Sequence, residues 1–171
     1  MKIYDTKSRD VRLVGASNGV MNMYCCGPTV YRDAHVGNLR TFLLSDLIAR
    51  IAKLEGMQVH VVQNITDVGH MSEDFVEHDK MLEQSKVEKV DPFEVARKYE
   101  DRFHIDLKRL NINPANEYPR ASESIQLMQE MIQKLLDSGF AYIGSDNSVY
   151  FDAQKFSGYG AISGNKLDSL K

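Results

Sequence analysis

The pattern of hydrophobic and polar positions predicts a strand, a helix and a second strand in the first third of the chain. Val20–Cys26 is a short, mostly apolar run that ends at a Gly-Pro turn. From Gly37 onward, apolar side chains recur at helical spacing, and Gly56 follows as a stop signal. Gln58–Ile65 is rich in β-branched residues and predicts the second strand. This order is typical of a βαβ unit with two parallel strands. The expected apolar stripe of the helix comprises Leu39, Phe42, Leu43, Leu47, Ile48, Ile51 and Leu54.

The second half of the chain predicts mainly helices. A charged, helical stretch runs to Val90, and Asp91 followed by proline is a typical helix start. A further helix is expected over roughly Ala121–Ser138, with Gly139 as its C-cap. The helix after Asp91 has an expected apolar stripe of Ala96, Tyr99, Phe103, Leu107 and Leu110. Short strands are expected at Lys2–Tyr4, Val11–Val14, Phe140–Ile143 and Ser148–Phe151.

Composition and charge narrow the class of protein. The chain has 171 residues, of which 43% are hydrophobic and 26% charged, which is ordinary for a folded domain. The net charge of −3 gives no overall cationic field for nucleic acid, although a local basic patch is compatible with it. No apolar run is long enough to span a membrane, and the N-terminus lacks the apolar stretch of a signal peptide. The only two cysteines are adjacent, so we expect reduced thiols and a cytoplasmic protein.

The junction between the first strand and the helix combines residues that suit nucleotide binding. Ligands of doubly wound sheets collect where parallel strands end, and Cys26 lies at such an end. The helix start offers backbone N–H groups and a positive dipole end to a phosphate. His35 and Asn38 can both donate hydrogen bonds there, and Gly37 permits a close approach to the backbone.

Several motifs of the chain resemble one enzyme family in the right order. The stretches CGPTVY and HVGN, at residues 26–31 and 35–38, resemble the start of class I aminoacyl-tRNA synthetases and, among them, the cysteinyl-tRNA synthetases. QNITDV at 63–68 is similar to the second-strand motif of that family, and YPRA at 118–121 to its helical insertion. YGAIS at 159–163 resembles the point where the inserted segment begins to return.

This resemblance implies an α/β fold: the Rossmann-like (HUP-type) half of a class I synthetase catalytic domain with a largely helical connecting insertion. Residues 1–70 would form the first half of that nucleotide-binding domain. Residues 71–171 would form the helical insertion and a small hairpin that lead into the connective segment, before the second catalytic half.

The resemblance also implies roles for particular residues. His35 and Asn38 fall on catalytic positions that bind the phosphates of ATP, and Gly37 belongs to the same ATP-binding motif. A second set falls near the bound cysteine or its adenylate: Gly27, Thr29 and Thr66. Cys26 falls on the first zinc ligand of the family, in which the metal binds the thiol of substrate cysteine and so rejects serine. Cys25, on the other strand face, is expected to pack only.

The implied activity is that of a cysteine–tRNA ligase, which activates cysteine with ATP and Mg²⁺ and transfers it to tRNA(Cys). The other zinc ligands and the KMSKS loop of the family lie beyond the point that this sequence reaches. We therefore expect the 171 residues alone to be inactive and Cys26 alone not to hold Zn²⁺. His70, Asp74 and His78 would share one helical face and leave a substitute metal site conceivable, but a solvated charged face is the favoured interpretation.

Two alternatives remain open at this stage. One is a short stand-alone paralogue that binds ATP or cysteine, or acts as an interaction module. The other is a related ligase that joins cysteine to an amine other than tRNA. Neither the oligomeric state nor the role of the loop Val68-Gly69-His70 follows from the sequence.

Overall fold

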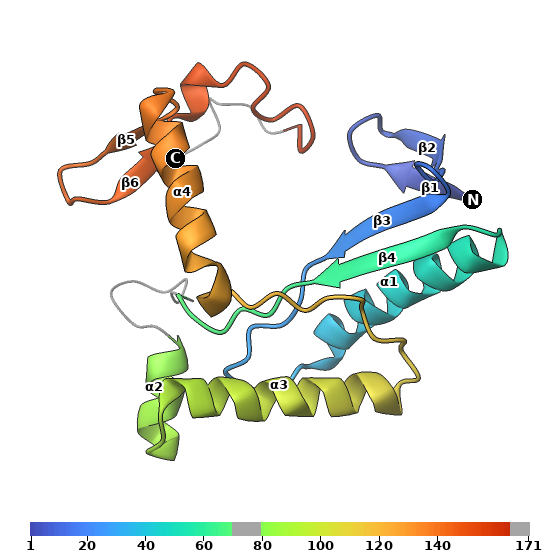
Figure 1. Ribbon diagram of the computed structural model, residues 1–171, viewed down its shortest axis with the longest axis horizontal. Coiled ribbons are helices and arrows are strands. Elements are labelled where there is room, and N and C mark those ends of the chain that lie inside the picture. The colour runs from blue at the N-terminus through green and yellow to red at the C-terminus, as the bar shows by residue number, and fades with distance from the viewer. Residues whose placement is uncertain (70–79, 165–171) are drawn as a thin grey trace. The chain divides into compact units, whose positions relative to one another are not determined.

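A computed structural model of the chain describes residues 1–69 and 80–164 (Figure 1). The chain forms two compact units, one of Met1–Val14 with Ile125–Lys171 and the other of Gly15–Ser124. These units are divided differently from the boundary that the sequence suggests at residue 70, because the helix after Asp91 packs onto the βαβ unit. No helix in the described ranges combines the length and the apolar character needed to cross a membrane.

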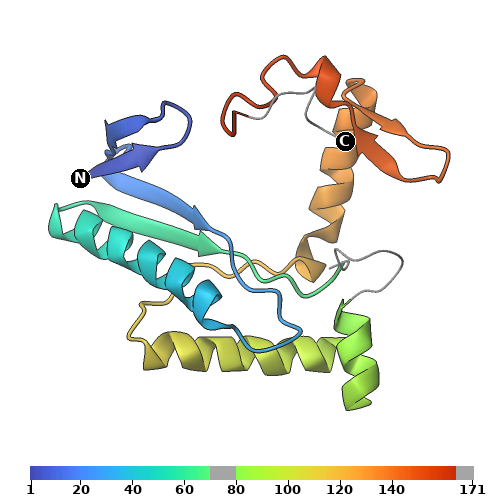
Figure 2. The ribbon, with the colours of Figure 1, turned by 180° about the vertical axis from the view of Figure 1, so that it is seen from behind.

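The βαβ unit predicted from the sequence is confirmed in the second unit. Strand β3 (Val20–Cys25) pairs in parallel with β4 (Gln58–Gln63), and helix α1 (Val36–Leu54) connects them. The register places Val20 opposite Gln58 and Cys25 opposite Gln63, so the two strands end together. The view from behind shows α1 running along this strand pair (Figure 2). The α/β class is therefore as expected.

A third, extended segment runs beside β4 and corrects the expectation for the YPRA motif. Residues 118–121 are not helical; backbone bridges pair Glu117 with Val62 and Arg120 with Ile65, both in parallel. The Ile65 N–H donates to the Pro119 carbonyl at 2.9 Å. The proline carbonyl can still accept a bond although its nitrogen cannot donate one, which is why this motif tolerates an extended position at the sheet edge.

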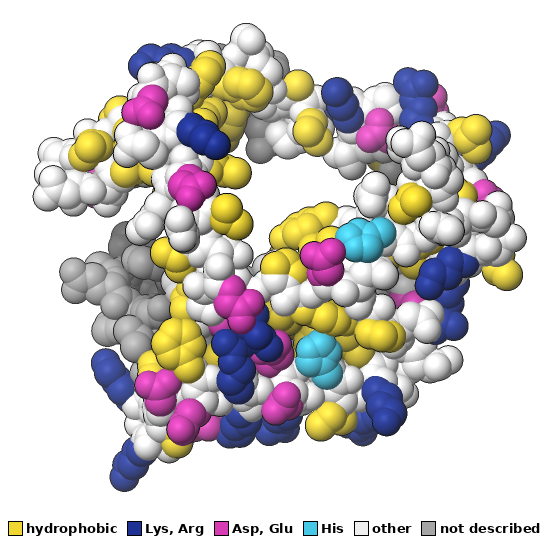
Figure 3. All heavy atoms as spheres, in the orientation of Figure 1, with side chains coloured by type: hydrophobic (Ala, Val, Ile, Leu, Met, Phe, Trp, Pro, Cys, Tyr) yellow, Lys and Arg dark blue, Asp and Glu magenta, His cyan; other side chains and the backbone are white. Residues whose placement is uncertain are grey.

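Two helices follow β4, and the second of them completes the core. Helix α2 (Lys80–Glu88) precedes α3 (Pro92–Arg109), whose N-cap Asp91 accepts the Phe93 N–H at 2.8 Å as the sequence predicts. The Phe103 ring of α3 packs edge-on against Phe42 of α1, with ring centroids 5.3 Å apart. The buried core cluster comprises Val30, Phe42, Ile65, Val95, Ala96, Tyr99, Phe103, Leu107 and Ile112. The expected stripe of α3 is thus buried except for Leu110, which is 42% exposed. On the outside of α3, lysine and arginine side chains are interspersed with acidic ones (Figure 3).

The apolar stripe expected for α1 is only partly buried. The helix buries Phe42, Asp46, Ala49 and Ala52. Four members of the expected stripe are instead exposed: Leu43, Leu47, Ile51 and Leu54. Among the described residues β3 pairs in a sheet only with β4, so this flank of α1 lies over no further strand. The four exposed side chains form an apolar surface on α1. Parallel sheets are normally covered on both faces, so such a surface is unusual beside a parallel strand pair.

The other unit contains short antiparallel pairs and one helix. Its strands β1 (Lys2–Asp5) and β2 (Asp10–Leu13) form a hairpin, as do β5 (Ala141–Ile143) and β6 (Val149–Phe151). Helix α4 (Ile125–Asp137) precedes β5 and buries none of its residues. Short 3-10 turns occupy Ser122–Ser124, which belongs to the βαβ unit, and Ala153–Lys155. These elements match the expected ones to within a few residues.

Candidate functional site

The ends of β3 and β4 are joined by a close backbone approach at Gly27. A Cβ at this position would lie 1.7 Å from the carbonyl oxygen of Asn64, so only glycine fits. The Asn64 Oδ1 accepts the Gly27 N–H at 2.9 Å and the Tyr24 hydroxyl at 3.0 Å. The Asn64 Nδ2 donates to Thr66 Oγ1 at 3.2 Å. One side chain thus links both strand ends to Thr66. Sequence analysis assigned Asn64 no role, although it lies within the motif at 63–68.

The two threonines expected near the amino acid are brought side by side. Thr29 and Thr66 form a parallel bridge, in which the Thr66 N–H donates to the Pro28 carbonyl at 3.0 Å and the Val30 N–H donates to the Thr66 carbonyl at 3.1 Å. Because Thr66 Oγ1 accepts from Asn64, its hydroxyl proton must be directed to a different acceptor.

His35 and Asn38 form a reciprocal cap on the first turn of α1. The His35 Nδ1 accepts the backbone N–H groups of Gly37 at 3.1 Å and Asn38 at 3.3 Å. The Asn38 Oδ1 in turn accepts the His35 N–H at 3.2 Å. A Cβ on Gly37 would lie 2.9 Å from the His35 Cε1, so the glycine leaves room for the imidazole. In this conformation the Gly37 and Asn38 amides bind the histidine, whereas the sequence suggested that they are open to a phosphate.

This cap decides which polar atoms of the two side chains are not used within the helix start. Nδ1 of His35 is an acceptor, so the proton of the neutral ring lies on Nε2. With its Oδ1 bound to the backbone, Asn38 likewise presents its Nδ2 as a donor. Both side chains are exposed, and the first turn of α1 contains no acidic residue. Two donors at the positive end of a helix dipole favour an anion.

A pocket of about 140 Å³ lies between the strand ends and this helix start. Four of the expected site residues line it: Gly27, Thr29, His35 and Asn38. Its remaining lining residues, which sequence analysis did not single out, are Pro28, Tyr31, Arg32, Asp33 and Ala34. Thr66 adjoins the pocket through its pairing with Thr29, and Cys26 immediately precedes Gly27 without lining it.

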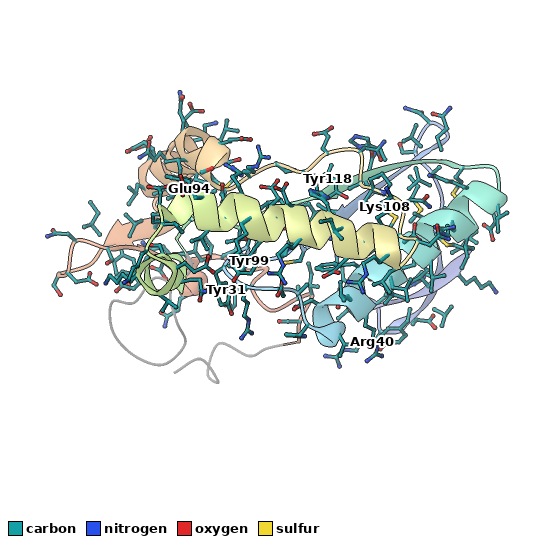
Figure 4. The ribbon with its side chains drawn as sticks, turned by 90° about the horizontal axis from the view of Figure 1, so that it is seen from below. Tyr31, Arg40, Glu94, Tyr99, Lys108 and Tyr118 are labelled. Carbon is teal, nitrogen blue, oxygen red and sulfur yellow. The ribbon has the colours of Figure 1, made fainter. Side chains whose placement is uncertain are left out.

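The loop of residues 27–35, here called the pocket loop, is anchored on α3. Val30 is 1% exposed in the core, and the Asp33 carboxylate pairs with the Arg102 Nε at 2.7 Å. Tyr31 packs against the same core. In Figure 4, Tyr31 and Tyr99 are on one side of α3, and Tyr118, from the extended segment, is on the other side. The loop is therefore fixed at both its middle and its end.

The two cysteines differ as expected from their positions in the strand. Both are free thiols; Cys25 is buried and Cys26 is exposed. In the part of the chain that the structure describes, no three histidine, cysteine, aspartate or glutamate side chains gather as a metal site. Cys26 alone does not fit Zn²⁺, which needs three or four protein ligands. The conceivable site of His70, Asp74 and His78 lies outside the described residues, as does the end of the loop Val68-Gly69-His70.

Replacing Gly27 by alanine is expected to lower the free energy of unfolding by about 2–3 kcal/mol, because the new methyl group collides with a backbone carbonyl that cannot rotate away. Chemical denaturation followed by circular dichroism measures this change. The matched control is Gly15→Ala, since a Cβ at Gly15 meets no atom within 4 Å. We expect the control to change the free energy by less than about 1 kcal/mol. Equal effects of the two substitutions would contradict the close approach.

Comparisons with known proteins identify the family to which the chain is similar. Residues 13–171 match the family described as tRNA synthetases class I (C) catalytic domain. Over 172 residues, the chain is 39% identical to a cysteine–tRNA ligase of Clostridioides difficile, covering 100% of this chain and 35% of that protein. It is 42% identical over 168 residues to the corresponding ligase of Deinococcus radiodurans, covering 97% of this chain and 34% of that protein. The chain thus spans about a third of the length of these relatives.

One solved structure supports the fold alone. Mycobacterium tuberculosis methionyl-tRNA synthetase, in complex with methionyl-adenylate, superposes with a TM-score of 0.57 at 20% sequence identity. The match covers 71% of this chain and 23% of that one.

Proposed function

Because the chain belongs to the family of class I (C) tRNA synthetase catalytic domains, we propose that it supplies the ATP- and cysteine-binding part of a cysteine–tRNA ligase. The complete reaction joins the carboxylate of cysteine to the α-phosphate of ATP, releases pyrophosphate and then transfers the cysteinyl group to tRNA(Cys). The observation that carries this proposal is the reciprocal cap of His35 and Asn38, which leaves one hydrogen-bond donor on each of these two pocket-lining side chains.

The proposed chemistry needs positioning and charge stabilisation rather than a general base. The nucleophile is a carboxylate, which is already ionised at neutral pH, and negative charge grows on the phosphate oxygens as the bond to pyrophosphate breaks. Nε2–H of His35 and Nδ2–H of Asn38 would donate to those oxygens, in addition to the dipole of α1. The Mg²⁺ that accompanies ATP would neutralise the other phosphates.

The proposed amino-acid end of the pocket lies at the paired strand ends. Gly27 and Thr29 line the pocket, and the Thr66 hydroxyl would donate its proton to an acceptor on the substrate. The exposed thiol of Cys26 adjoins this end. Cys26 would be one ligand of a Zn²⁺ that binds the substrate thiol, but the residues described here do not complete such a site. Free thiols on both cysteines support the cytoplasmic location that we propose.

The apolar surface of the βαβ unit supports a role as part of a longer catalytic domain. The exposed leucine flank of α1 and the single pairing of β3 leave room for another strand and its covering helix. We propose that the additional length carried by the relatives covers this surface, and that residues 1–171 by themselves do not catalyse adenylate formation.

Pyrophosphate exchange tests the proposed function. The longest natural product that contains these residues is incubated with ATP, Mg²⁺ and labelled pyrophosphate, and label appearing in ATP is measured with cysteine, with serine and without amino acid. We expect exchange that depends on cysteine, and none from residues 1–171 alone. Exchange that is equal with serine, or that is absent from the longest product, would contradict the proposal.

A further inference from the structure

A buried carboxylate, Asp67, directly follows Thr66, which pairs with Thr29 of the pocket. The Asp67 side chain is 0% exposed and uses both of its oxygens. Its Oδ1 accepts the Ser122 backbone N–H at 2.9 Å, and its Oδ2 accepts the Ser122 hydroxyl at 2.6 Å. The Arg97 guanidinium approaches Oδ2 at 3.4 Å. A charge in this position is retained only because these donors replace its water.

The contacts of Asp67 continue into a chain of three ion pairs, which the backbone from Arg120 to Ser122 closes into a ring. Arg97 also donates to Glu100 at 2.8 Å, and Glu100 accepts from Arg120 at 2.9 Å. Burial alone would raise the pKa of Glu100, but the hydrogen bonds from Arg120 and Arg97 keep it below its ordinary value, so this carboxylate stays ionised. Arg120 pairs through its backbone with Ile65 and leads, two residues on, to Ser122. The ring thus joins the end of β4, α3 and the extended segment.

Thr66 is held from both sides by this arrangement. On one side its backbone N–H and carbonyl pair with Pro28 and Val30 of the pocket loop. On the other side its two neighbours in sequence are fixed, since the Ile65 carbonyl accepts the Ala121 N–H at 2.9 Å and Asp67 binds Ser122. Asp67 is therefore the last anchor before the chain leaves the sheet.

Asparagine cannot replace this carboxylate fully. All three groups that face Asp67 are donors, so the carboxylate accepts from each of them. An amide of the same shape has one oxygen and turns its NH₂ group toward at least one of these donors. Hydrogen bonds to charged groups are among the stronger ones in proteins. Their loss at Asp67 is therefore expected to loosen the backbone of the neighbouring Thr66.

We propose that Asp67 is a positioning residue that fixes the Thr66 hydroxyl beside Thr29 for the bound amino acid. This proposal deepens the proposed function and rests on it for the identity of the ligand. Asp67 touches no reacting atom. Its role is to prevent the segment after β4 from moving away from the pocket loop.

Amide hydrogen exchange of the 171-residue chain, measured by NMR, tests the structural half of this proposal. In Asp67→Asn the amides of Thr66 and Val30, which bridge the two loops, are expected to exchange about 10- to 100-fold faster. The amide of Ala49, in the buried face of α1, is expected to keep its wild-type rate. The control is Glu123→Gln, because Glu123 binds Arg120 at the exposed edge of the ring and should leave all these rates unchanged.

A graded variant keeps the test decisive if Asp67→Asn does not fold. Ser122→Ala removes only the hydroxyl bond and retains the backbone N–H bond and the carboxylate, so a smaller acceleration at the same two amides is expected. Equal acceleration of all amides would mean that Asp67 only stabilises the fold. An unchanged Thr66 amide would mean that other contacts hold it. Either result overturns the proposal.

Kinetics of the longest natural product tests the functional half. Asp67→Asn is expected to raise the KM for cysteine about tenfold in pyrophosphate exchange. The KM for ATP is expected to stay within about twofold, because the cap formed by His35 and Asn38 uses only atoms of residues 35–38 and does not involve Asp67 or Thr66. Equal rises in both KM values, or no rise for cysteine, would overturn the positioning role. If the wild-type protein shows no exchange, the proposed function fails, and the amide exchange rates still decide whether Asp67 holds Thr66.

Discussion

Replacing His35 by alanine is expected to slow cysteine-dependent pyrophosphate exchange about 100- to 1,000-fold, the usual effect of removing one donor that stabilises transition-state charge. The imidazole has two separate tasks in this structure. Its Nδ1 caps two amides of α1, which leaves Nε2–H as the donor of a residue that lines the pocket. Alanine removes both, so a fall in activity alone does not show which task matters.

The variant His35→Asn separates the two tasks of the histidine. Asparagine is a good N-cap, so its Oδ1 can accept the same amides and keep α1 intact. Its amide nitrogen does not reach as far as Nε2, so the donor in the pocket is lost. We therefore expect His35→Asn to match the wild type in thermal denaturation and to resemble His35→Ala in exchange rate. Wild-type activity of His35→Asn would show that the cap, and not the donor, is what the reaction needs.

Replacing Phe103 by alanine is expected to lower the free energy of unfolding by about 3–5 kcal/mol. Phe103 is 2% exposed and belongs to the buried core. The centroid of its ring lies 5.3 Å from that of Phe42 and 6.3 Å from that of Tyr118. These rings come from three segments: α1, α3 and the extended segment beside β4. Removing the ring leaves a cavity where all three meet, and the fixed strand ends prevent it from closing.

Urea denaturation measures this loss, with Ile105→Ala as the matched control on the same helix. Ile105 is 56% exposed, so its truncation removes little buried surface and should change the free energy by less than about 1 kcal/mol. A Phe103→Ala variant that is as stable as Ile105→Ala would show that α3 does not pack on α1 in solution.

Much of the candidate site was predictable because its residues are close in sequence. The turn after the first strand and the start of the next helix are separated by fewer than a dozen residues, so any βαβ unit brings Gly27, Thr29, His35 and Asn38 to one sheet edge. The parallel strand order likewise follows from periodicity alone. Thr66 was assigned from the family resemblance alone, and the structure pairs it with Thr29.

Burial could not be predicted in the same way. The stripe of α1 was assigned from spacing, yet Leu43, Leu47, Ile51 and Leu54 are exposed, while Asp46 is buried and binds Asn113 at 2.9 Å. Spacing identifies an apolar face but not the partner that covers it. The extended course of residues 118–121 was missed for a related reason, because a strand at a sheet edge depends on a neighbour more than 50 residues away.

The sequence by itself determined the order of the main strands and helices and four of the residues that line the pocket, since local hydrogen bonding and short separations fix both. Only the tertiary structure decided how the pocket residues are used. It showed which nitrogen of His35 caps α1, which carbonyl makes Gly27 obligatory, and that the Asp67 carboxylate next to Thr66 is fully buried. The physical reason is that these properties are set by atoms from distant segments, and a sequence pattern carries no record of which distant atoms meet.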